Sequence, residues 1–328
     1  MEMRELGHTG LRVTPIGLGL AALGRPAYIT TGRDDDLGEG EDRSIEAMEA
    51  RSHEVLDAAW SAGIRYLDAA RSYGYAERFL ASWLRARAID PSQVTVGSKW
   101  GYRYVGEWRM DAPVHEVKDH SISMLRTQLP ESRELLGPWL RLYQVHSATL
   151  ESGILADGAV LAELVRLRAE DRLVIGLSVS GPRQADVVRA ALEVRVDGVN
   201  PFGCVQATWN VLEPSAGPAL AEAHGAGWGV IVKEALANGR VLEDDESLAP
   251  IAAAAERHGT TPDAIALAAT LAQPWAGVVL SGAATPDQLR SNVAAVAVAL
   301  EAGEIEALLG LAEPPDAYWE ARAARAWA

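Results

Sequence analysis

The stretch IRYLDAARSYG, residues 64–74, begins as a short apolar run, reaches the carboxylate of Asp68, and continues into Tyr73 and Gly74. The run is too short for a typical helix and glycines flank it, which favours a buried strand. Polar side chains at the carboxyl ends of parallel strands are typical of barrels, which hold their reactive groups there. We therefore interpret residues 64–68 as one strand of a parallel sheet.

Seven further runs have the same character, being short, continuous in apolar residues and bounded by turn residues. The eight predicted strands are residues 15–20, 64–68, 93–98, 140–146, 173–178, 203–207, 229–232 and 277–281. Continuous rather than alternating apolar character is expected where a strand is buried on both faces of a parallel sheet.

Helical patterns fill most of the intervals. They cover residues 45–62, 76–88, 161–170, 184–192, 218–224, 247–258 and 286–300. Eight strands alternating with helices predict an α/β fold, a (β/α)8 TIM barrel. A doubly wound open sheet is the alternative, but the glycines around Gly17 and Gly19 do not form its GxGxxG fingerprint.

The whole chain, residues 1–328, is predicted to form one barrel domain. Three of its segments are additions to a minimal barrel. Residues 4–14 predict an N-terminal β-hairpin around Thr9-Gly10. The acidic connection 24–44 is either a solvated loop or a wall of the site. A C-terminal tail after the last predicted helix either packs on the barrel or lines the pocket.

Composition excludes several classes of protein. The formal net charge is −15, which repels phosphate backbones and argues against nucleic-acid binding. The single cysteine, Cys204, cannot form an internal disulfide, and the start lacks the apolar segment of a signal peptide. The most apolar stretch, residues 264–280, is too short and too interrupted to span a membrane. We expect a cytoplasmic protein with a small-molecule partner.

Four polar residues belong to the ends of three neighbouring predicted strands: Asp68 with Tyr73, Lys99 and His146. Singly, each has a structural explanation, such as a helix cap or packing. Together they suit proton transfer, because an adjacent cation is expected to lower the pKa of a tyrosine. Asp68 can hold Lys99 charged, and His146 can orient a carbonyl oxygen beside Tyr73. This set predicts protonation of a carbonyl oxygen as hydride reaches the carbonyl carbon.

At these residues the chain resembles the aldo-keto reductase superfamily over nearly its whole length. The matching motifs are Arg4-x-Leu6-Gly7-x-Thr9-Gly10, Tyr66-Leu67-Asp68-x4-Tyr73-Gly74, Ser98-Lys99 and Leu142-Tyr143-Gln144-Val145-His146. The resemblance implies that Tyr73 is the proton donor, that Lys99 and Asp68 tune it, and that His146 positions the substrate.

The resemblance also implies residues that hold a nicotinamide cofactor. These are Ser178, Gln206, Lys233, Leu236, Gly282, Gln288 and Asn292. Two departures from the family stand out. Val179 replaces an asparagine that usually follows Ser178, and Lys233 replaces an aromatic residue that stacks on the nicotinamide ring.

The family usually binds NADP(H), with a basic residue near the 2′-phosphate. Residues 282–288 contain no base, and Asp287 would repel a phosphate if it faced inward. We expect NADPH as the cofactor, with NADH as a serious alternative and weak discrimination between them.

Aromatic residues are candidates for the substrate pocket, and no metal site is predicted. The candidates are Trp100, Tyr102, Tyr104, Trp108, Tyr318, Trp319 and Trp327. His115 and His120 are expected on the surface of a helical region. The oligomeric state is open.

The predicted function is NAD(P)H-dependent interconversion of an aldehyde, ketone or sugar and its alcohol. Three alternatives remain: an NAD-dependent sugar dehydrogenase, a nicotinamide-binding regulatory subunit with little turnover, and a barrel aldolase using Lys99 as a Schiff base.

Overall fold

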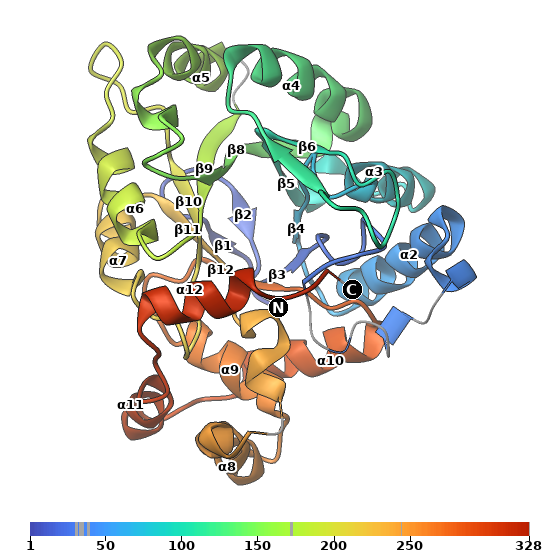
Figure 1. Ribbon diagram of the computed structural model, residues 1–328, viewed down its shortest axis with the longest axis vertical. Coiled ribbons are helices and arrows are strands. Elements are labelled where there is room, and N and C mark those ends of the chain that lie inside the picture. The colour runs from blue at the N-terminus through green and yellow to red at the C-terminus, as the bar shows by residue number, and fades with distance from the viewer. Residues whose placement is uncertain (30–31, 33–35, 38–39, 171–172, 244, 328) are drawn as a thin grey trace.

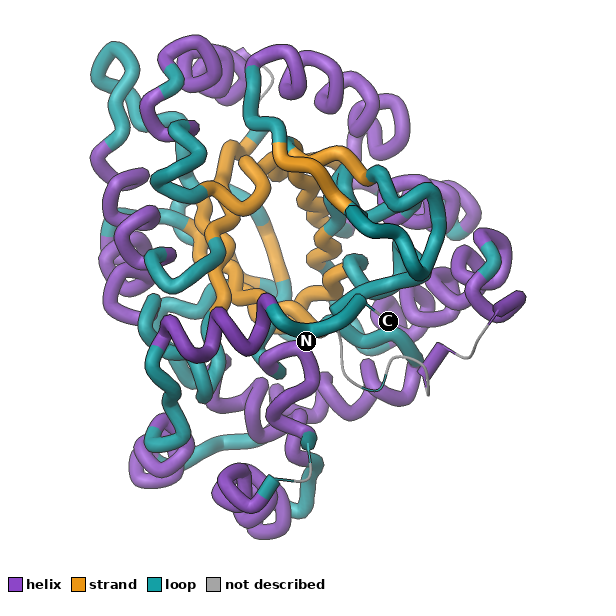
Figure 2. Tube along the Cα trace, in the orientation of Figure 1, coloured by secondary structure: helices purple, strands orange, loops and turns teal. Residues whose placement is uncertain are grey.

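The computed structural model describes residues 1–29, 32, 36–37, 40–170, 173–243 and 245–327. Within these residues, eight parallel strands close into a barrel and the helices surround it (Figures 1 and 2). The barrel strands are β3 (Ile16–Gly19), β4 (Tyr66–Asp68), β5 (Thr95–Trp100), β8 (Leu140–Ala148), β9 (Val174–Val179), β10 (Cys204–Thr208), β11 (Gly229–Lys233) and β12 (Val278–Ser281). The predicted TIM barrel is confirmed, and each predicted strand overlaps an observed one.

The barrel closes by pairing its first and last strands, with Ile16 of β3 opposite Val279 of β12. The N-terminal hairpin, β1 (Arg4–Glu5) and β2 (Arg12–Val13), lies against the amino ends of the strands. Leu6 packs so tightly on Gly229 that a Cβ there would lie 2.5 Å from the Leu6 Cγ. The hairpin thus closes the amino end of the barrel, and the carboxyl ends are left for the site.

The predicted helices are all present. They are α2 (Ile45–Ser61), α3 (Ala76–Ala86), α5 (Gly158–Glu170), α6 (Gln184–Glu193), α7 (Gly217–Gly225), α8 (Ala249–His258) and α10 (Pro286–Ala294). Helix α10 ends at Ala294, six residues before the predicted end at residue 300. The chain continues as a short 3-10 helix, and its backbone is extended at Val298.

Several elements were not predicted. They are the antiparallel pair β6 (Tyr102–Tyr104) and β7 (Glu116–Lys118), and the helices α4 (Ile122–Leu136), α9 (Pro262–Leu271), α11 (Ala302–Leu309) and α12 (Pro315–Ala323). Figure 1 shows α12 and the segment after it, in red, lying across one side of the barrel opening. Among the described helices, none is both long and apolar enough to cross a membrane.

Candidate active site

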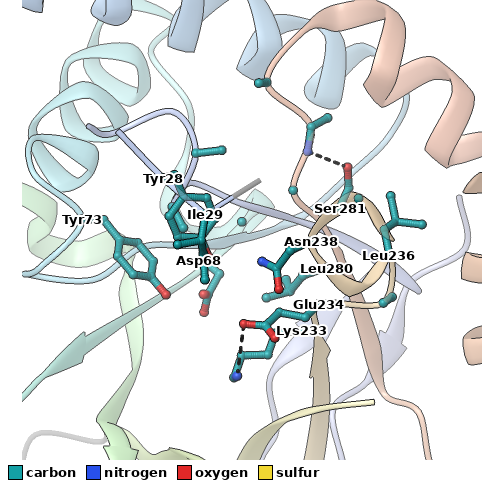
Figure 3. A pocket seen from close by; sticks show the side chains of 18 of the residues that line it. Tyr28, Ile29, Asp68, Tyr73, Lys233, Glu234, Leu236, Asn238, Leu280 and Ser281 are labelled. Atoms are coloured by element: carbon teal, nitrogen blue, oxygen red, sulfur yellow. Dashed lines mark hydrogen bonds and ion pairs between the residues drawn. The ribbon is translucent and has the colours of Figure 1, made fainter. Parts of the chain in front are cut away.

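A cavity of about 670 Å³ opens at the carboxyl ends of the strands. Its walls come from barrel strand ends and from the connection after β3, parts of which Figure 3 shows. The residues after β12 and the tail that follows α12 complete the lining. Arg25, Tyr28, Ile29 and Asp36 of the connection line it, so this segment is a wall of the site where the structure describes it. The tail contributes Trp327 to the lining, whereas Tyr318 and Trp319 pack in the core behind it.

The four predicted catalytic residues lie together at one end of this cavity. Lys99 is fully buried within β5 and donates hydrogen bonds to the Asp68 carboxylate and to the carbonyl oxygen of Ala69, the latter at 3.1 Å. Its Nζ also lies 3.4 Å from the hydroxyl of Tyr73. The Tyr73 ring meets the His146 ring edge to face, with 5.4 Å between centroids. Asp68, Tyr73 and His146 line the cavity.

The pKa of Tyr73 differs from the sequence-based expectation. Burial of the phenol raises its pKa well above 10, and the charge of Asp68 raises it further, while Arg25 lowers it. The expected lowering of the Tyr73 pKa by an adjacent cation is therefore wrong. The reason is that Asp68 is ion-paired with Lys99 and offsets its charge, while burial destabilises the phenolate. Tyr73 thus holds its proton at neutral pH.

His146 is held as a neutral imidazole. Burial lowers its pKa well below 6.5, and the cations Lys99, Arg25 and Lys233 lower it further. Its Nδ1 lies 3.3 Å from the Ser72 hydroxyl, and its backbone oxygen lies 2.8 Å from His120 Nε2. A neutral imidazole with one nitrogen engaged this way leaves the other ring nitrogen for a ligand.

The expectations for His115 and His120 are wrong. Both side chains are buried, and neither lies in a helix. His115 precedes β7 and stacks on Trp327, whereas His120 lies between β7 and α4. The β6–β7 pair, which the sequence did not indicate, brings His115 to the tail.

Asp68 is the centre of a buried hydrogen-bond network rather than a helix cap. Its Oδ1 accepts from the Tyr66 hydroxyl and from Gln206 Nε2, each at 3.0 Å. Gln206, a predicted cofactor contact, also lines the cavity. Ser178 instead accepts a 2.8 Å hydrogen bond from the backbone N–H of Ser147 and is not among the described residues of the lining.

Lys233 lies at the end of β11, across the cavity from Tyr73 (Figure 3). Its Nζ donates to the Thr208 hydroxyl at 2.7 Å and lies 3.7 Å from Glu234 Oε1. Burial lowers the pKa of Lys233 to about 8. Thr208 and Glu234 thus hold the Lys233 ammonium on one side. The sequence alone did not show these contacts.

Glu234 was missed by sequence reasoning. It lies in the left-handed region, with φ of 57°, and its carboxylate forms a two-point ion pair with Arg322 of α12, one bond being 2.8 Å from Arg322 Nε. Arg322 and Lys233 lower the pKa of Glu234 to about 2 despite its burial. This ion pair joins α12 to the barrel beside the catalytic residues.

Acid titration tests this ion pair. A pKa of about 2, against 4.5 for an ordinary glutamate, corresponds to about 3 kcal/mol of stability. Because the folded-state pKa is lowered, this contribution is present above about pH 4.5 and is lost as the pH falls toward 2. We expect the Glu234→Gln variant to lose less unfolding free energy than the wild type between about pH 5 and pH 3 in urea titrations.

The matched control for Glu234→Gln is Glu256→Gln, which changes an exposed glutamate of α8. That variant is expected to keep the acid dependence of the wild type. An acid dependence that is equal in all three proteins would contradict the stabilising role of the Glu234 ion pair.

The segment after β12 forms the far end of the cavity. Gly282, Gln288 and Asn292, which are predicted cofactor contacts, line it. Gln288 Nε2 donates to Asp36 Oδ2 at 2.6 Å, and Asn292 Nδ2 donates to Asp263 Oδ2 at 2.6 Å.

The Asp287 side chain is 91% exposed and pairs with Arg290, although Asp287 is also among the residues that line the cavity. The acid that is hydrogen-bonded to the Gln288 side chain is Asp36, which comes from a different part of the chain.

Asn238 is a second residue that sequence reasoning missed. It lies in a left-handed turn that Gly239 continues, two residues after Leu236, a predicted cofactor contact that lines the cavity. Asn238 is 8% exposed and lines the cavity, and its Oδ1 has no hydrogen-bond partner among the residues that the structure describes. A buried acceptor without a partner is costly, so its place in a cavity indicates a ligand. The Asn238-Gly239 pair, favourable for left-handed backbone, was the available signal.

The sequence model of the Aldo/keto reductase family matches residues 15–313, which is most of the chain. The chain belongs to the aldo/keto reductase family. This is a family of nicotinamide-dependent oxidoreductases, so the chain is an enzyme of that class. The resemblance carried by the sequence motifs is thereby confirmed.

Individual relatives agree with this family. A pyridoxal 4-dehydrogenase from Microbacterium luteolum is 30% identical over 166 residues, which are 44% of this chain and 43% of that protein. The match thus spans less than half of that curated relative.

Solved structures share the fold. A Pseudomonas aeruginosa protein described as an aldo-keto reductase has a TM-score of 0.64 at 25% identity, over 90% of this chain and 94% of its own. A holo-form aldo-keto reductase from Bacillus halodurans has a TM-score of 0.68 over 96% and 97% of the two chains, at 21% identity.

Proposed function

We propose that the chain, as one barrel domain over residues 1–328, reduces an aldehyde or ketone to the alcohol and catalyses the reverse oxidation. The observation that carries this proposal is the position of Tyr73, a protonated phenol in the cavity wall between Lys99 Nζ, 3.4 Å away, and the His146 ring. An acid held beside a neutral hydrogen-bond donor suits protonation of a carbonyl oxygen.

Each residue has a defined task in this proposal. Tyr73 donates its proton to the carbonyl oxygen, and neutral His146 orients that oxygen by a hydrogen bond. Lys99 holds the Tyr73 hydroxyl and stabilises the phenolate left after proton transfer, and Asp68 is a positioning residue that holds the Lys99 ammonium in place. The nicotinamide cofactor supplies hydride to the carbonyl carbon, or accepts it in the reverse direction.

The cavity fits a dinucleotide. It extends from Tyr73 to Gln288, and the Oδ1 of Asn238, which lacks a partner among the described residues, lies in its wall. We propose that the cofactor is held by Gln206, Lys233, Leu236, Asn238, Gly282, Gln288 and Asn292. Ser178 is left out of this set because its hydroxyl is engaged by Ser147.

We propose NADP(H) as the cofactor, following the family, with weak discrimination against NAD(H). Asp36 supports the second part, because its carboxylate is hydrogen-bonded to Gln288, where the resemblance puts an adenine contact. A carboxylate at this end repels a 2′-phosphate and can accept a hydrogen bond from a 2′-hydroxyl.

The Asp36→Asn variant tests this placement. We expect it to bind NADPH about tenfold more tightly, because removal of a negative charge favours the 2′-phosphate. Its affinity for NADH should fall or stay level. Dissociation constants from fluorescence titration at fixed ionic strength measure both effects.

The control for Asp36→Asn is Asp287→Asn, which removes a solvent-exposed carboxylate from the same region. A similar gain in both variants would indicate a general charge effect. A wild-type preference for NADPH above about a hundredfold would contradict weak discrimination.

The experiment that tests the proposed function is the change in nicotinamide absorbance with a panel of aldehydes, ketones and alcohols. Turnover supports the proposal, whereas binding of the cofactor without any turnover would favour the regulatory-subunit alternative. The aldolase alternative finds no support in Lys99, which is fully buried and ion-paired with Asp68, because a Schiff-base lysine must be reachable and uncharged.

A narrower candidate is dehydrogenation of a hydroxylated aromatic aldehyde of the pyridoxal type. The partial match to a pyridoxal 4-dehydrogenase favours it. Pyridoxal with the oxidised cofactor is therefore the first substrate to assay in the oxidative direction.

A further inference from the structure

The end of the cavity that holds Tyr73 is lined by several charged side chains beside the aromatic rings of Tyr28 and Trp327. Apart from the proposed catalytic residues, the charged and polar side chains are Arg25, Tyr102, Glu116, Lys233, Glu234 and Arg322. Most ligand pockets are predominantly apolar with a few polar groups, so this composition needs an explanation.

The first pair of charges lies directly beside the proposed acid. Arg25 Nη1 donates to Glu116 Oε1 at 2.7 Å, and the two side chains are 3% and 19% exposed. The guanidinium carbon of Arg25 lies 5.1 Å from the centroid of the Tyr73 ring. Any substrate that brings its carbonyl to Tyr73 therefore passes close to this guanidinium–carboxylate pair.

The second pair is Glu234 with Arg322, and Figure 3 shows Glu234 on the other side of the cavity from Tyr73. Glu234 and Arg322 are 7% and 23% exposed and face the cavity, and Lys233 stands next to them. Glu234 and Lys233 both line the cavity opposite the Tyr73 side chain (Figure 3). A substrate at Tyr73 is thus flanked by donors and acceptors on two sides.

Resting on the proposed function, we propose that the substrate is a hydroxyl-rich carbonyl compound whose hydroxyl groups bind the Arg25–Glu116 and Glu234–Arg322 pairs. Each pair offers a carboxylate to accept from a hydroxyl and a guanidinium to donate to one. An apolar substrate would displace water from these charges without replacing its hydrogen bonds, which weakens binding.

Two kinds of substrate share this chemistry: an aldose, and a hydroxylated aromatic aldehyde such as pyridoxal. Both carry hydroxyl groups on the carbons next to, or near, the reacting carbon. The experiment below separates them.

The wild-type enzyme tests the inference with two matched substrate pairs: glyceraldehyde against propanal, and pyridoxal against pyridine-4-carbaldehyde. In at least one pair we expect kcat/KM to be about a hundredfold higher for the hydroxylated member, since two charge-assisted hydrogen bonds are gained. The pair that shows the preference identifies the kind of substrate. Equal kcat/KM within both pairs would overturn the inference alone, whereas no turnover with any of the four would overturn the proposed function and the inference with it.

Variants then test the two ion pairs as the source of the preference. Glu116→Gln and Glu234→Gln keep the side-chain size and remove the charge, and each is expected to shrink the substrate preference at least about tenfold, mainly through KM of the hydroxylated member. The control is Glu222→Gln, which changes a surface pair with Arg189 whose side chains are 48% and 46% exposed, and it should leave the preference unchanged.

A preference that survives in both cavity variants would overturn the inference and leave the ion pairs with a structural role only. Thermal unfolding of each variant checks that it is folded at the assay temperature.

Discussion

Replacement of Tyr73 by phenylalanine is expected to lower kcat for carbonyl reduction by about 10³-fold and to leave cofactor affinity nearly unchanged. The substitution removes the proposed proton donor and little contact area, because the ring and its edge-to-face packing on His146 are retained. Steady-state kinetics and cofactor titration measure the two effects separately.

The control for Tyr73→Phe is Tyr104→Phe, because the Tyr104 hydroxyl accepts a hydrogen bond from the backbone of Trp108 and lies outside the described cavity lining. That variant should keep most of the wild-type kcat. If Tyr73→Phe retains more than about a tenth of wild-type kcat, Tyr73 is not the acid.

The pH dependence of the reaction follows from the same residue. Burial and Asp68 keep the pKa of Tyr73 well above 10, so the proton donor is not lost as the pH rises from 7 to about 9. We expect kcat for reduction to show no loss from this group in that interval.

The second large effect is expected at Asp68. Asp68→Asn leaves the buried ammonium of Lys99 without its counter-ion and is expected to lower the free energy of unfolding by about 3–5 kcal/mol. The double variant Asp68→Asn/Lys99→Met removes both charges, so it should cost clearly less than the sum of the two single changes. Urea unfolding of the four proteins measures the coupling.

A surface pair provides the control for Asp68→Asn. Asp186 pairs with Arg183 at 3.2 Å, and both side chains are more than half exposed, at 53% and 60%. Asp186→Asn should cost less than about 1 kcal/mol, because exposed ion pairs contribute little. If Asp68→Asn and Asp186→Asn lowered the free energy of unfolding by similar amounts, the buried Asp68–Lys99 pair would not have the proposed stabilising role.

The sequence predicted the barrel because its strands are continuous apolar runs between glycines and polar ends. It failed where no such pattern exists. Helix α9 is buried at eight consecutive residues from Asp263 to Thr270, so it has no polar face to reveal a helical period. Helix α4 contains Pro130, which hides its continuity, and the β6–β7 pair is too polar and aromatic to read as a strand pair.

The residues of the candidate site likewise include some that the sequence could place and some that it could not. Residues at strand ends could be placed together, because parallel strands end at one edge of the barrel. Contacts between distant segments could not be placed, such as Gln288 with Asp36 or Glu234 with Arg322. The pKa of Tyr73 was predicted in the wrong direction because burial, and the ion pair that offsets the charge of Lys99, are properties of the folded protein.

The order of synthesis gives the tail a particular importance. Trp327 stacks on His115 with 4.3 Å between ring centroids and lies 4.7 Å from the guanidinium of Arg25. These contacts join the tail to two segments that leave the ribosome roughly two hundred or more residues earlier, at about 5–20 residues per second. The barrel itself can close once β12 is free of the ribosome, so a nascent chain can be folded for seconds before its active site has this wall.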